Sequence, residues 1–246
     1  MHRNQFGLIG RNIGYSFSKN YFSKKFEANN LIDYSYENFD IPNVVEFLNC
    51  IEDNPNLKGM NVTIPYKESI IPFLDELSEK AGQIGAVNTI AFTKKGKLKG
   101  YNTDYYGFKK AIQPLLQSHH EKALLLGTGG AAKAVAFALE QLDIEPTFVS
   151  RKTSGDTLCY EQISAATFND FQIVINCTPL GTSPNIGNCP DIPYHFFTPK
   201  HIALDLIYTP EETLFLQKAK LHGAITKNGL DMLIFQAEKA WEIWNM

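Results

Sequence analysis

One stretch of this sequence constrains the fold more than any other, because an apolar run leads directly into a glycine-rich turn. Residues 123–126 (Ala-Leu-Leu-Leu) have the continuous apolar character of a parallel strand that is buried on both faces. A glycine-rich turn and a predicted helix over residues 131–142 follow. Backbone amides of such a turn can bind a pyrophosphate. We therefore predict a dinucleotide-binding site, with a structural tight turn as the alternative, at Gly127, Thr128, Gly129, Gly130 and Ala131.

The alternation of strand and helix continues beyond this turn. Strands are predicted over residues 147–150, 171–176 and 202–206, and a helix over residues 211–221. This order is typical of a doubly wound, Rossmann-like α/β sheet. We assign residues 103–229 to a domain of this kind.

The N-terminal part of the chain also reads as α/β, but with a different kind of sheet. Its alternating predicted elements are strands over 6–9, 34–39, 57–64, 86–92 and 98–101 and helices over 19–29, 44–50 and 70–82. The turn over residues 94–97 joins the last two strands as a hairpin, so the sheet is expected to be mixed. A last helix is predicted over residues 230–244. We assign residues 1–102 plus 230–246 to this second α/β domain.

Charge and cysteine usage narrow the class of partner. The 246-residue chain has 23 Lys and Arg against 26 Asp and Glu, so its net charge of -3 gives no reason to expect nucleic acid or a membrane surface. The four cysteines form no CxxC pair, and we expect no metal site. The N-terminus lacks a signal-peptide pattern, and no apolar run has the length of a membrane span. We expect a cytoplasmic protein that acts on a small molecule.

The end of the strand predicted over residues 147–150 indicates which dinucleotide binds. An NAD site usually has an acidic residue there, which accepts a hydrogen bond from the ribose 2′-hydroxyl. This chain instead has Ser150, Arg151 and Lys152. Arg151 can pair with a 2′-phosphate through two hydrogen bonds, and Lys152 adds a second positive charge. The sequence therefore favours NADP over NAD, with a solvated basic turn as the alternative.

Polar residues in the N-terminal part gather in three short motifs. These are NVTIPYK over residues 61–67, GAVNT over residues 85–89 and GYNTD over residues 100–104. Pro65 is expected to end a strand and to project Lys67 from the following connection. Asp104 lies where the two domains meet along the chain, and a cleft between domains is a common ligand site.

These motifs, with Ser16-Phe17-Ser18, LLGTGGAAKA, VSRK, INCTPLG, DLIYTPEET and NGLDMLIFQA, resemble the shikimate dehydrogenase family over nearly the whole chain. The resemblance implies reversible, NADPH-dependent reduction of 3-dehydroshikimate to shikimate in aromatic amino-acid biosynthesis. It makes residues 1–102 plus 230–246 the substrate-binding and catalytic domain, with Lys67 and Asp104 as catalytic residues. The implied substrate-binding residues are Ser16, Ser18, Asn61, Thr63, Asn88, Tyr208 and Gln236. The cofactor-binding residues are those of the glycine-rich turn together with Ser150, Arg151, Lys152, Thr178 and Gly229.

The residues fit the implied chemistry. Hydride addition to a carbonyl group leaves negative charge on its oxygen, which a cation or proton donor must meet. Lys67 is the candidate for this role, and Asp104 can hold its ammonium group through a charge-assisted hydrogen bond. Whether Lys67 transfers the proton or only stabilises charge stays open, as does a plain surface salt bridge. The hydroxyls of Ser16 and Ser18 can donate to the substrate carboxylate.

The sequence departs from the family pattern at four places. Tyr15 and Lys19 replace the usual His and Pro around the two serines, and Tyr101 and Tyr105 flank the Asn-Thr-Asp element. A second arginine after the basic turn is absent, and Asp231 replaces a common small residue in the final NGLxML element. Two alternatives stay open. One is an NAD-accepting quinate/shikimate dehydrogenase, because such relatives share the lysine, the aspartate and the glycine loop. The other, from another class, is a noncatalytic regulator that responds to a dinucleotide, because a fold does not guarantee a function. The sequence is compatible with a monomer or a homodimer.

Overall fold

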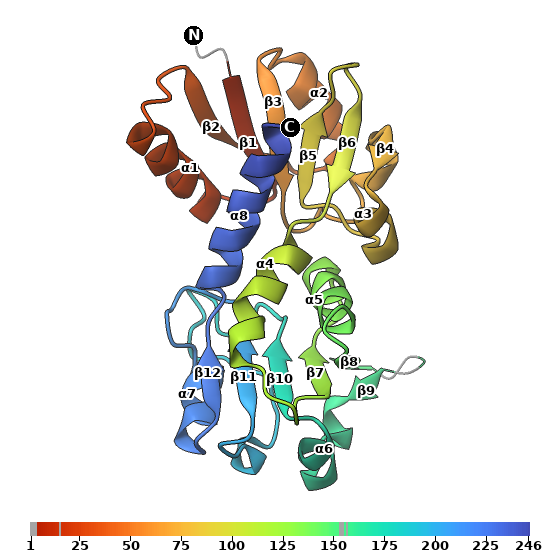
Figure 1. The fold of residues 1–246 in the computed structure, drawn as a ribbon, viewed down its shortest axis with the longest axis vertical. Helices are drawn as coiled ribbons and strands as arrows, with labels where there is room; N and C mark the ends of the chain where they lie inside the picture. Colours follow the sequence, from red (N-terminus) through yellow and green to blue (C-terminus); the bar gives the residue numbers. More distant parts are fainter. Residues whose placement is uncertain (1–3, 15, 153–154, 156) are drawn as a thin grey trace. The chain divides into compact units, whose positions relative to one another are not determined.

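The computed structural model describes residues 4–14, 16–152, 155 and 157–246 (Figure 1). The chain forms two compact units. The first comprises Met1–Thr103 with Ala237–Met246, and the second comprises Asp104–Gln236. Within the described residues, each unit contains one six-stranded sheet. The helix α8 (Leu230–Trp244) begins in the second unit and ends in the first.

A mixed sheet with the strand order β2-β1-β3-β5-β6-β4 forms the base of the first unit. The strand β1 pairs in parallel with β2 and β3, whereas β5 is antiparallel to both β3 and β6. The prediction of a mixed sheet is thus confirmed. The strands are β1 (Asn4–Gly10), β2 (Tyr34–Asp40), β3 (Leu57–Val62), β4 (Glu76–Leu77), β5 (Thr89–Phe92) and β6 (Leu98–Tyr101).

Alternating side chains of β1 enter two separate cores of the first unit. Phe6 and Leu8 belong to a core that includes Phe22 of α1 (Phe17–Ala28) and Ala237 of α8. Ile9 belongs to the other core, which includes residues of α2 (Phe47–Glu52) and α3 (Glu79–Ile84). The period of two along a strand thus lets one sheet bury both of its faces.

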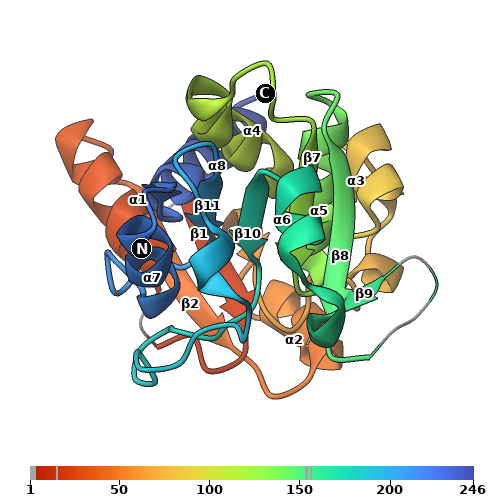
Figure 2. The same cartoon turned by 90° about the horizontal axis from the view of Figure 1, so that it is seen from below.

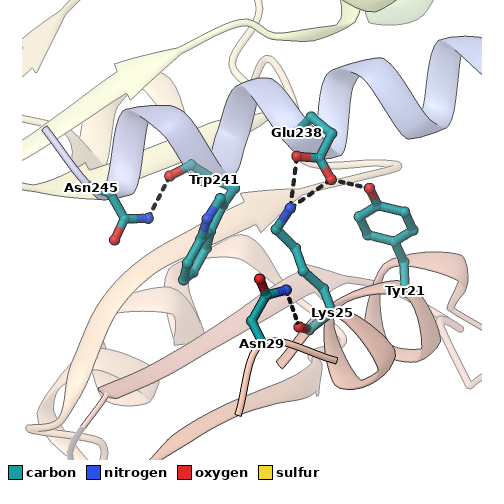
Figure 3. A network of polar contacts seen from close by, with 6 residues as sticks. All are labelled: Tyr21, Lys25, Asn29, Glu238, Trp241 and Asn245. Atoms are coloured by element: carbon teal, nitrogen blue, oxygen red, sulfur yellow. Dashed lines mark hydrogen bonds and ion pairs between the residues drawn. The ribbon is translucent and has the colours of Figure 1, made fainter. Parts of the chain in front are cut away.

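Polar contacts also fix the C-terminal part of α8 to α1 (Figure 3). Lys25 Nζ donates to the two carboxylate oxygens of Glu238 at 2.8 and 2.7 Å, and the hydroxyl of Tyr21 donates to the same carboxylate. The Lys25 ammonium also lies 5.9 Å from the ring centroid of Trp241. These contacts hold the helix whose first turn carries Ser18.

The prediction of one helix over residues 70–82 is wrong. The segment contains a 3-10 turn (Ile71–Phe73), then β4, and only then α3. Pairing of β4 with β6 overrides the helical pattern, and the Ser78 hydroxyl caps α3 by accepting from the Ala81 amide at 3.2 Å. The strands β3 and β5 are also shorter than predicted, because β3 ends at Val62 and β5 begins at Thr89.

The second unit has a fully parallel sheet with the strand order β12-β11-β10-β7-β8-β9. Counted along the chain from β7, this is the order 3-2-1-4-5-6 of a doubly wound nucleotide-binding fold. The prediction of a doubly wound sheet in this part of the chain is confirmed. The strand order reverses between β7 and β10. The strands are β7 (Lys122–Leu126), β8 (Glu145–Ser150), β9 (Leu158–Cys159), β10 (Ile173–Asn176), β11 (Ile202–Asp205) and β12 (Ile225–Lys227).

Helices cover both faces of this parallel sheet (Figure 2). Leu125 faces a core shared with α4 (Asp104–Ile112) and α5 (Gly130–Glu140). Leu124 faces a core shared with α6 (Ala165–Asp170) and α7 (Leu214–Leu221). The helix predicted over residues 211–221 begins only at Leu214, because the Thr213 hydroxyl caps it by accepting from the Leu216 amide at 3.4 Å.

Candidate active site

The turn between β7 and α5 has one crowded and one open side. Gly127 has a φ of 113°, which favours glycine, and a Cβ there would lie 3.3 Å from Thr178 Cγ2. At Gly129, the residue before the first residue of α5, a Cβ would meet nothing within 4 Å. Thr128 is exposed beside it. The turn therefore leaves open space directly in front of a helix N-terminus.

This geometry fits an anionic group such as a pyrophosphate. The first amides of α5, beginning with Gly130 and Ala131, have no partner within the helix and carry the positive end of its dipole. Ala132 is buried, so a small side chain is needed where the helix packs on the sheet. The residues of the turn thus fit the dinucleotide expected from the sequence.

The basic turn follows the end of β8, the strand next to β7. Its backbone is held by Ser150, whose hydroxyl accepts from the Lys152 amide at 3.1 Å and donates to the Lys152 carbonyl oxygen at 2.7 Å. The side chains of Arg151 and Lys152 are exposed. Two cationic groups in this position fit a 2′-phosphate. Residues 153, 154 and 156 lie outside the described part of the chain.

A second polar arrangement lies at the ends of β10 and β11. Thr178 is held by Asn176, whose Oδ1 accepts from the Thr178 amide at 3.0 Å and from its hydroxyl at 2.6 Å. The Nδ2 group of Asn176 donates to Asp205 Oδ1 at 3.1 Å. Burial raises the pKa of Asp205 to about 6, while its hydrogen bonds act in the opposite direction.

The same edge of the sheet supports Gly229. The Gly229 amide donates to the Ile207 carbonyl oxygen at 3.0 Å, and the carbonyl group of Leu206 leaves no space for a Cβ at Gly229. Thr178 and Gly229 are thus both anchored to strand ends of one sheet. The sequence prediction did not include Asn176 and Asp205, although a polar residue that ends an apolar strand is a signal for both.

In the first unit, hydrogen bonds connect two of the expected substrate-binding residues, Asn61 and Asn88, with Tyr36. Ser18 is buried in the first turn of α1. The hydroxyl group of Tyr36 donates to Asn61 Oδ1 at 2.7 Å. Asn61 Nδ2 in turn donates to the Asn88 carbonyl oxygen at 3.3 Å and to Thr89 Oγ1 at 3.2 Å. All of these residues are buried.

The Asn88 side chain extends this arrangement to the end of β6. Its Oδ1 accepts from the Thr103 amide at 2.6 Å, and its Nδ2 donates to Thr103 Oγ1 at 3.0 Å. Burial raises the pKa of Tyr36, whose neutral hydroxyl therefore stays a donor to Asn61. The sequence prediction missed Tyr36 and Thr89, which we now add to the candidate site.

The connection that bears Lys67 is fixed at several points. The Thr63 amide donates to the Ile9 carbonyl oxygen at 2.9 Å, and the Lys67 carbonyl oxygen accepts from the Val87 amide at 2.7 Å. Between them, the hydroxyl of buried Tyr66 donates to the Ile41 carbonyl oxygen at 2.7 Å. Lys67 therefore lies on an ordered connection, and its side chain is half-buried.

The remaining expected site residues are placed as follows. The Ser16 hydroxyl caps α1 by accepting from the Lys19 amide at 3.3 Å, and Tyr15 lies outside the described residues. In the second unit, Asp104 is the first residue of α4, half-buried Tyr208 follows the turn after β11, and buried Gln236 lies on α8.

Two features are absent from the described part of the chain. No group of three or more His, Cys, Asp or Glu side chains there could hold a metal ion. None of its helices combines the length and the apolar character that crossing a membrane requires.

Known proteins resemble this chain in sequence and in fold. Residues 8–90 match the family model described as the shikimate dehydrogenase substrate binding domain. A shikimate dehydrogenase (NADP(+)) of Clostridium botulinum is 38% identical over 249 residues, covering 97% of this chain and 95% of that protein.

Two crystal structures show the same similarity. Shikimate dehydrogenase 1 from Peptoclostridium difficile has 35% identity and a TM-score of 0.82, covering 98% of this chain and 91% of that one. Shikimate 5-dehydrogenase from Thermus thermophilus, in complex with NADP(H) and shikimate, has 30% identity and a TM-score of 0.86, covering 98% of this chain and 93% of that one.

Proposed function

This chain belongs to the shikimate dehydrogenase family, and from this premise we propose that it catalyses the reversible, NADPH-dependent reduction of 3-dehydroshikimate to shikimate in aromatic amino-acid biosynthesis. The observation that carries the proposal is the buried polar arrangement in the first unit, in which hydrogen bonds join Tyr36, Asn61, Asn88 and Thr89. A ring that bears several hydroxyl groups needs such a density of fixed donors and acceptors.

Asn61 supports this assignment through its remaining hydrogen-bonding capacity. Both of its Nδ2 protons and one lone pair of its Oδ1 are used within the protein. Asn61 can therefore accept one further hydrogen bond, which suits a substrate hydroxyl. We also assign binding of the substrate hydroxyl groups to Thr63, Asn88, Tyr208 and Gln236. Binding of the substrate carboxylate is assigned to Ser16 and Ser18.

Lys67 and Asp104 are assigned to the chemical step. When bound, NADPH supplies the hydride. The ammonium group of Lys67 then meets the negative charge that develops on the carbonyl oxygen of the substrate. We assign to the carboxylate of Asp104 the role that the family resemblance implies, which is to orient that ammonium group.

The second unit is assigned to the cofactor. The amides at Gly127–Ala131 would hold the pyrophosphate, with Thr178 and Gly229 completing the site. Arg151 and Lys152 would hold the 2′-phosphate and so favour NADP. NAD-dependent oxidation of quinate or shikimate is the second candidate, because residues after the basic turn differ from the family pattern.

We also propose a setting for the enzyme. Cys50, Cys159, Cys177 and Cys189 are free thiols, which supports a reducing compartment such as the cytoplasm. The net charge of -3 supports a small-molecule substrate without a nucleic-acid partner. We propose a monomer or a homodimer.

A spectrophotometric assay tests the function directly. Purified protein is mixed with shikimate or quinate and with either NADP+ or NAD+, and the absorbance of the reduced nicotinamide is followed. We expect a higher kcat/KM with shikimate and NADP+ than with any other combination of substrate and cofactor. Turnover of quinate with NAD+ at the higher efficiency would favour the second candidate, and no turnover with either substrate would contradict both.

A further inference from the structure

Asp205 is a fully buried carboxylate whose three hydrogen-bonding partners are all uncharged. Its Oδ1 accepts from Asn176 Nδ2 at 3.1 Å and from the Ile207 amide at 3.0 Å, and its Oδ2 accepts from the Thr213 hydroxyl at 2.6 Å. The partners come from the end of β10, the turn after β11 and the start of α7. One carboxylate thus joins three segments of the second unit.

Two of these three bonds, those from Asn176 and Ile207, lead toward residues of the candidate cofactor site. Asn176 uses its Oδ1 to hold both the amide and the hydroxyl of Thr178. Ile207, fixed by its own amide, offers its carbonyl oxygen to the Gly229 amide at 3.0 Å. Removing the carboxylate would therefore release Thr178 and Gly229 from a common anchor.

Folding stability alone does not explain this carboxylate. Its pKa of about 6 lies above the value for a free aspartate, so burial of the charged form near neutral pH opposes folding. A neutral side chain of similar shape would avoid this cost. Residues that reduce stability and also order a binding site are typically kept for function.

We propose that Asp205 is a positioning residue for cofactor binding, because it fixes Thr178 through Asn176 and Gly229 through the turn at residues 205–207. The identification of the ligand as NADP(H) rests on the proposed function. Among the described residues, the charge of Asp205 acts on the titratable groups of Cys177 and Tyr194. Burial raises the pKa of both, and the charge of Asp205 raises it further, so both stay neutral when Asp205 titrates.

The test measures NADPH binding without turnover, by titrating the fluorescence of the nicotinamide. Asp205→Ala removes all three acceptor bonds, and we expect its dissociation constant to rise about 10-fold. Asp205→Asn keeps an oxygen that can accept from Asn176 and Ile207, so it should restore binding to within about 3-fold of the wild type. Asn176→Ala removes the two bonds from Thr178 and those that Asn176 Nδ2 donates to Asp205 and to the Leu180 carbonyl oxygen, but it keeps the bond between Asp205 and Ile207. It should also weaken binding, even if Asp205→Ala fails to fold.

The pH profile separates positioning from a merely structural role. The ratio of dissociation constants, Asp205→Asn over wild type, should approach one below pH about 5, where both side chains are neutral, and rise above pH about 7. A ratio independent of pH, or wild-type binding by folded Asp205→Ala or Asn176→Ala, would overturn the proposal. Absence of NADPH binding by the wild-type protein would instead contradict the proposed function.

Discussion

Tyr36 on β2 donates a hydrogen bond of 2.7 Å to Oδ1 of Asn61 on β3, although β1 lies between these two strands in the sheet. This bond fixes which end of the Asn61 amide points toward Tyr36. The Nδ2 group must then face Asn88 and Thr89, where it finds two acceptors. A tyrosine outside the family motifs therefore decides the orientation of an expected substrate-binding residue.

Replacing Tyr36 with Phe tests this relationship. The substitution leaves the buried Oδ1 of Asn61 without its donor, so we expect KM for shikimate to rise by about 5- to 30-fold while kcat changes by less than about 3-fold. Steady-state kinetics provide the measurement. Tyr34→Phe on the same strand is the control, because the Tyr34 ring stacks on Phe6 and should retain wild-type kinetics. Equal kinetics of the two variants would show that Tyr36 does not contribute to substrate binding.

Replacing Lys67 with Ala tests the proposed chemical step. Loss of the group that meets the developing charge should lower kcat by about 10² to 10⁴, while the unfolding transition stays close to that of the wild type. Lys58→Ala, which removes an exposed lysine from β3, should keep full activity. Turnover of Lys67→Ala within about 3-fold of the wild type would exclude Lys67 from the mechanism.

Replacing Arg151 with Ala tests the preference for NADP. A charge-assisted bond to the 2′-phosphate contributes about 1.5 to 3 kcal/mol, so the ratio of kcat/KM with NADP to that with NAD should fall by about 10- to 150-fold. Nearly all of the loss should be with NADP. Arg11→Ala removes an exposed arginine of the first unit and should leave the ratio unchanged. An equal loss with both cofactors would argue against 2′-phosphate recognition by Arg151.

Two glycines of the first unit should respond to alanine in opposite directions. The indole ring of Trp244 lies directly against Gly59 and leaves no space for a Cβ, whereas a Cβ at exposed Gly82 in α3 meets nothing within 4 Å. Gly59→Ala should lower the free energy of unfolding by about 1 to 3 kcal/mol. Gly82→Ala should raise it by about 0.5 to 1 kcal/mol, because alanine favours a helix interior. Urea unfolding measures both free energies. Stabilisation by Gly59→Ala would contradict the close packing of Trp244 on Gly59.

The free energy of unfolding should also depend on pH through two buried histidines. Burial lowers the pKa of His120 and His201, and each Nδ1 accepts from a backbone amide, at 2.9 Å and 3.1 Å respectively. At these two histidines the unfolded chain therefore binds more protons once the pH falls below about 6.5, so their contribution to folding stability is lost in that range. Protonation of Asp205 acts in the opposite direction.

His201→Gln removes one of these titrating groups. We expect its free energy of unfolding to fall less than that of the wild type between pH about 7.5 and about 5.5. Exposed His222→Gln is the matched control and should follow the wild-type profile. Parallel profiles for His201→Gln and the wild type would show that His201 does not contribute to the pH dependence.

Local features of the sequence determined the fold of the second unit. The apolar run before Gly127, the glycines themselves and the repeated alternation of strand and helix are each readable within a few residues, and the parallel sheet of the second unit follows them. The sequence also determined the family, because the motifs that contain Asn61, Lys67 and Asn88 are contiguous in the chain.

Only the tertiary structure decided how the site residues are held. Glu76 and Leu77 look helical in isolation but form a strand, because β6 offers backbone partners to them. Tyr36 and Asn61 are 25 positions apart in the sequence, and Asn176 and Asp205 are 29 apart. No local pattern encodes such a pair, because a buried polar group is satisfied by whichever partner the packed sheets bring within hydrogen-bonding distance.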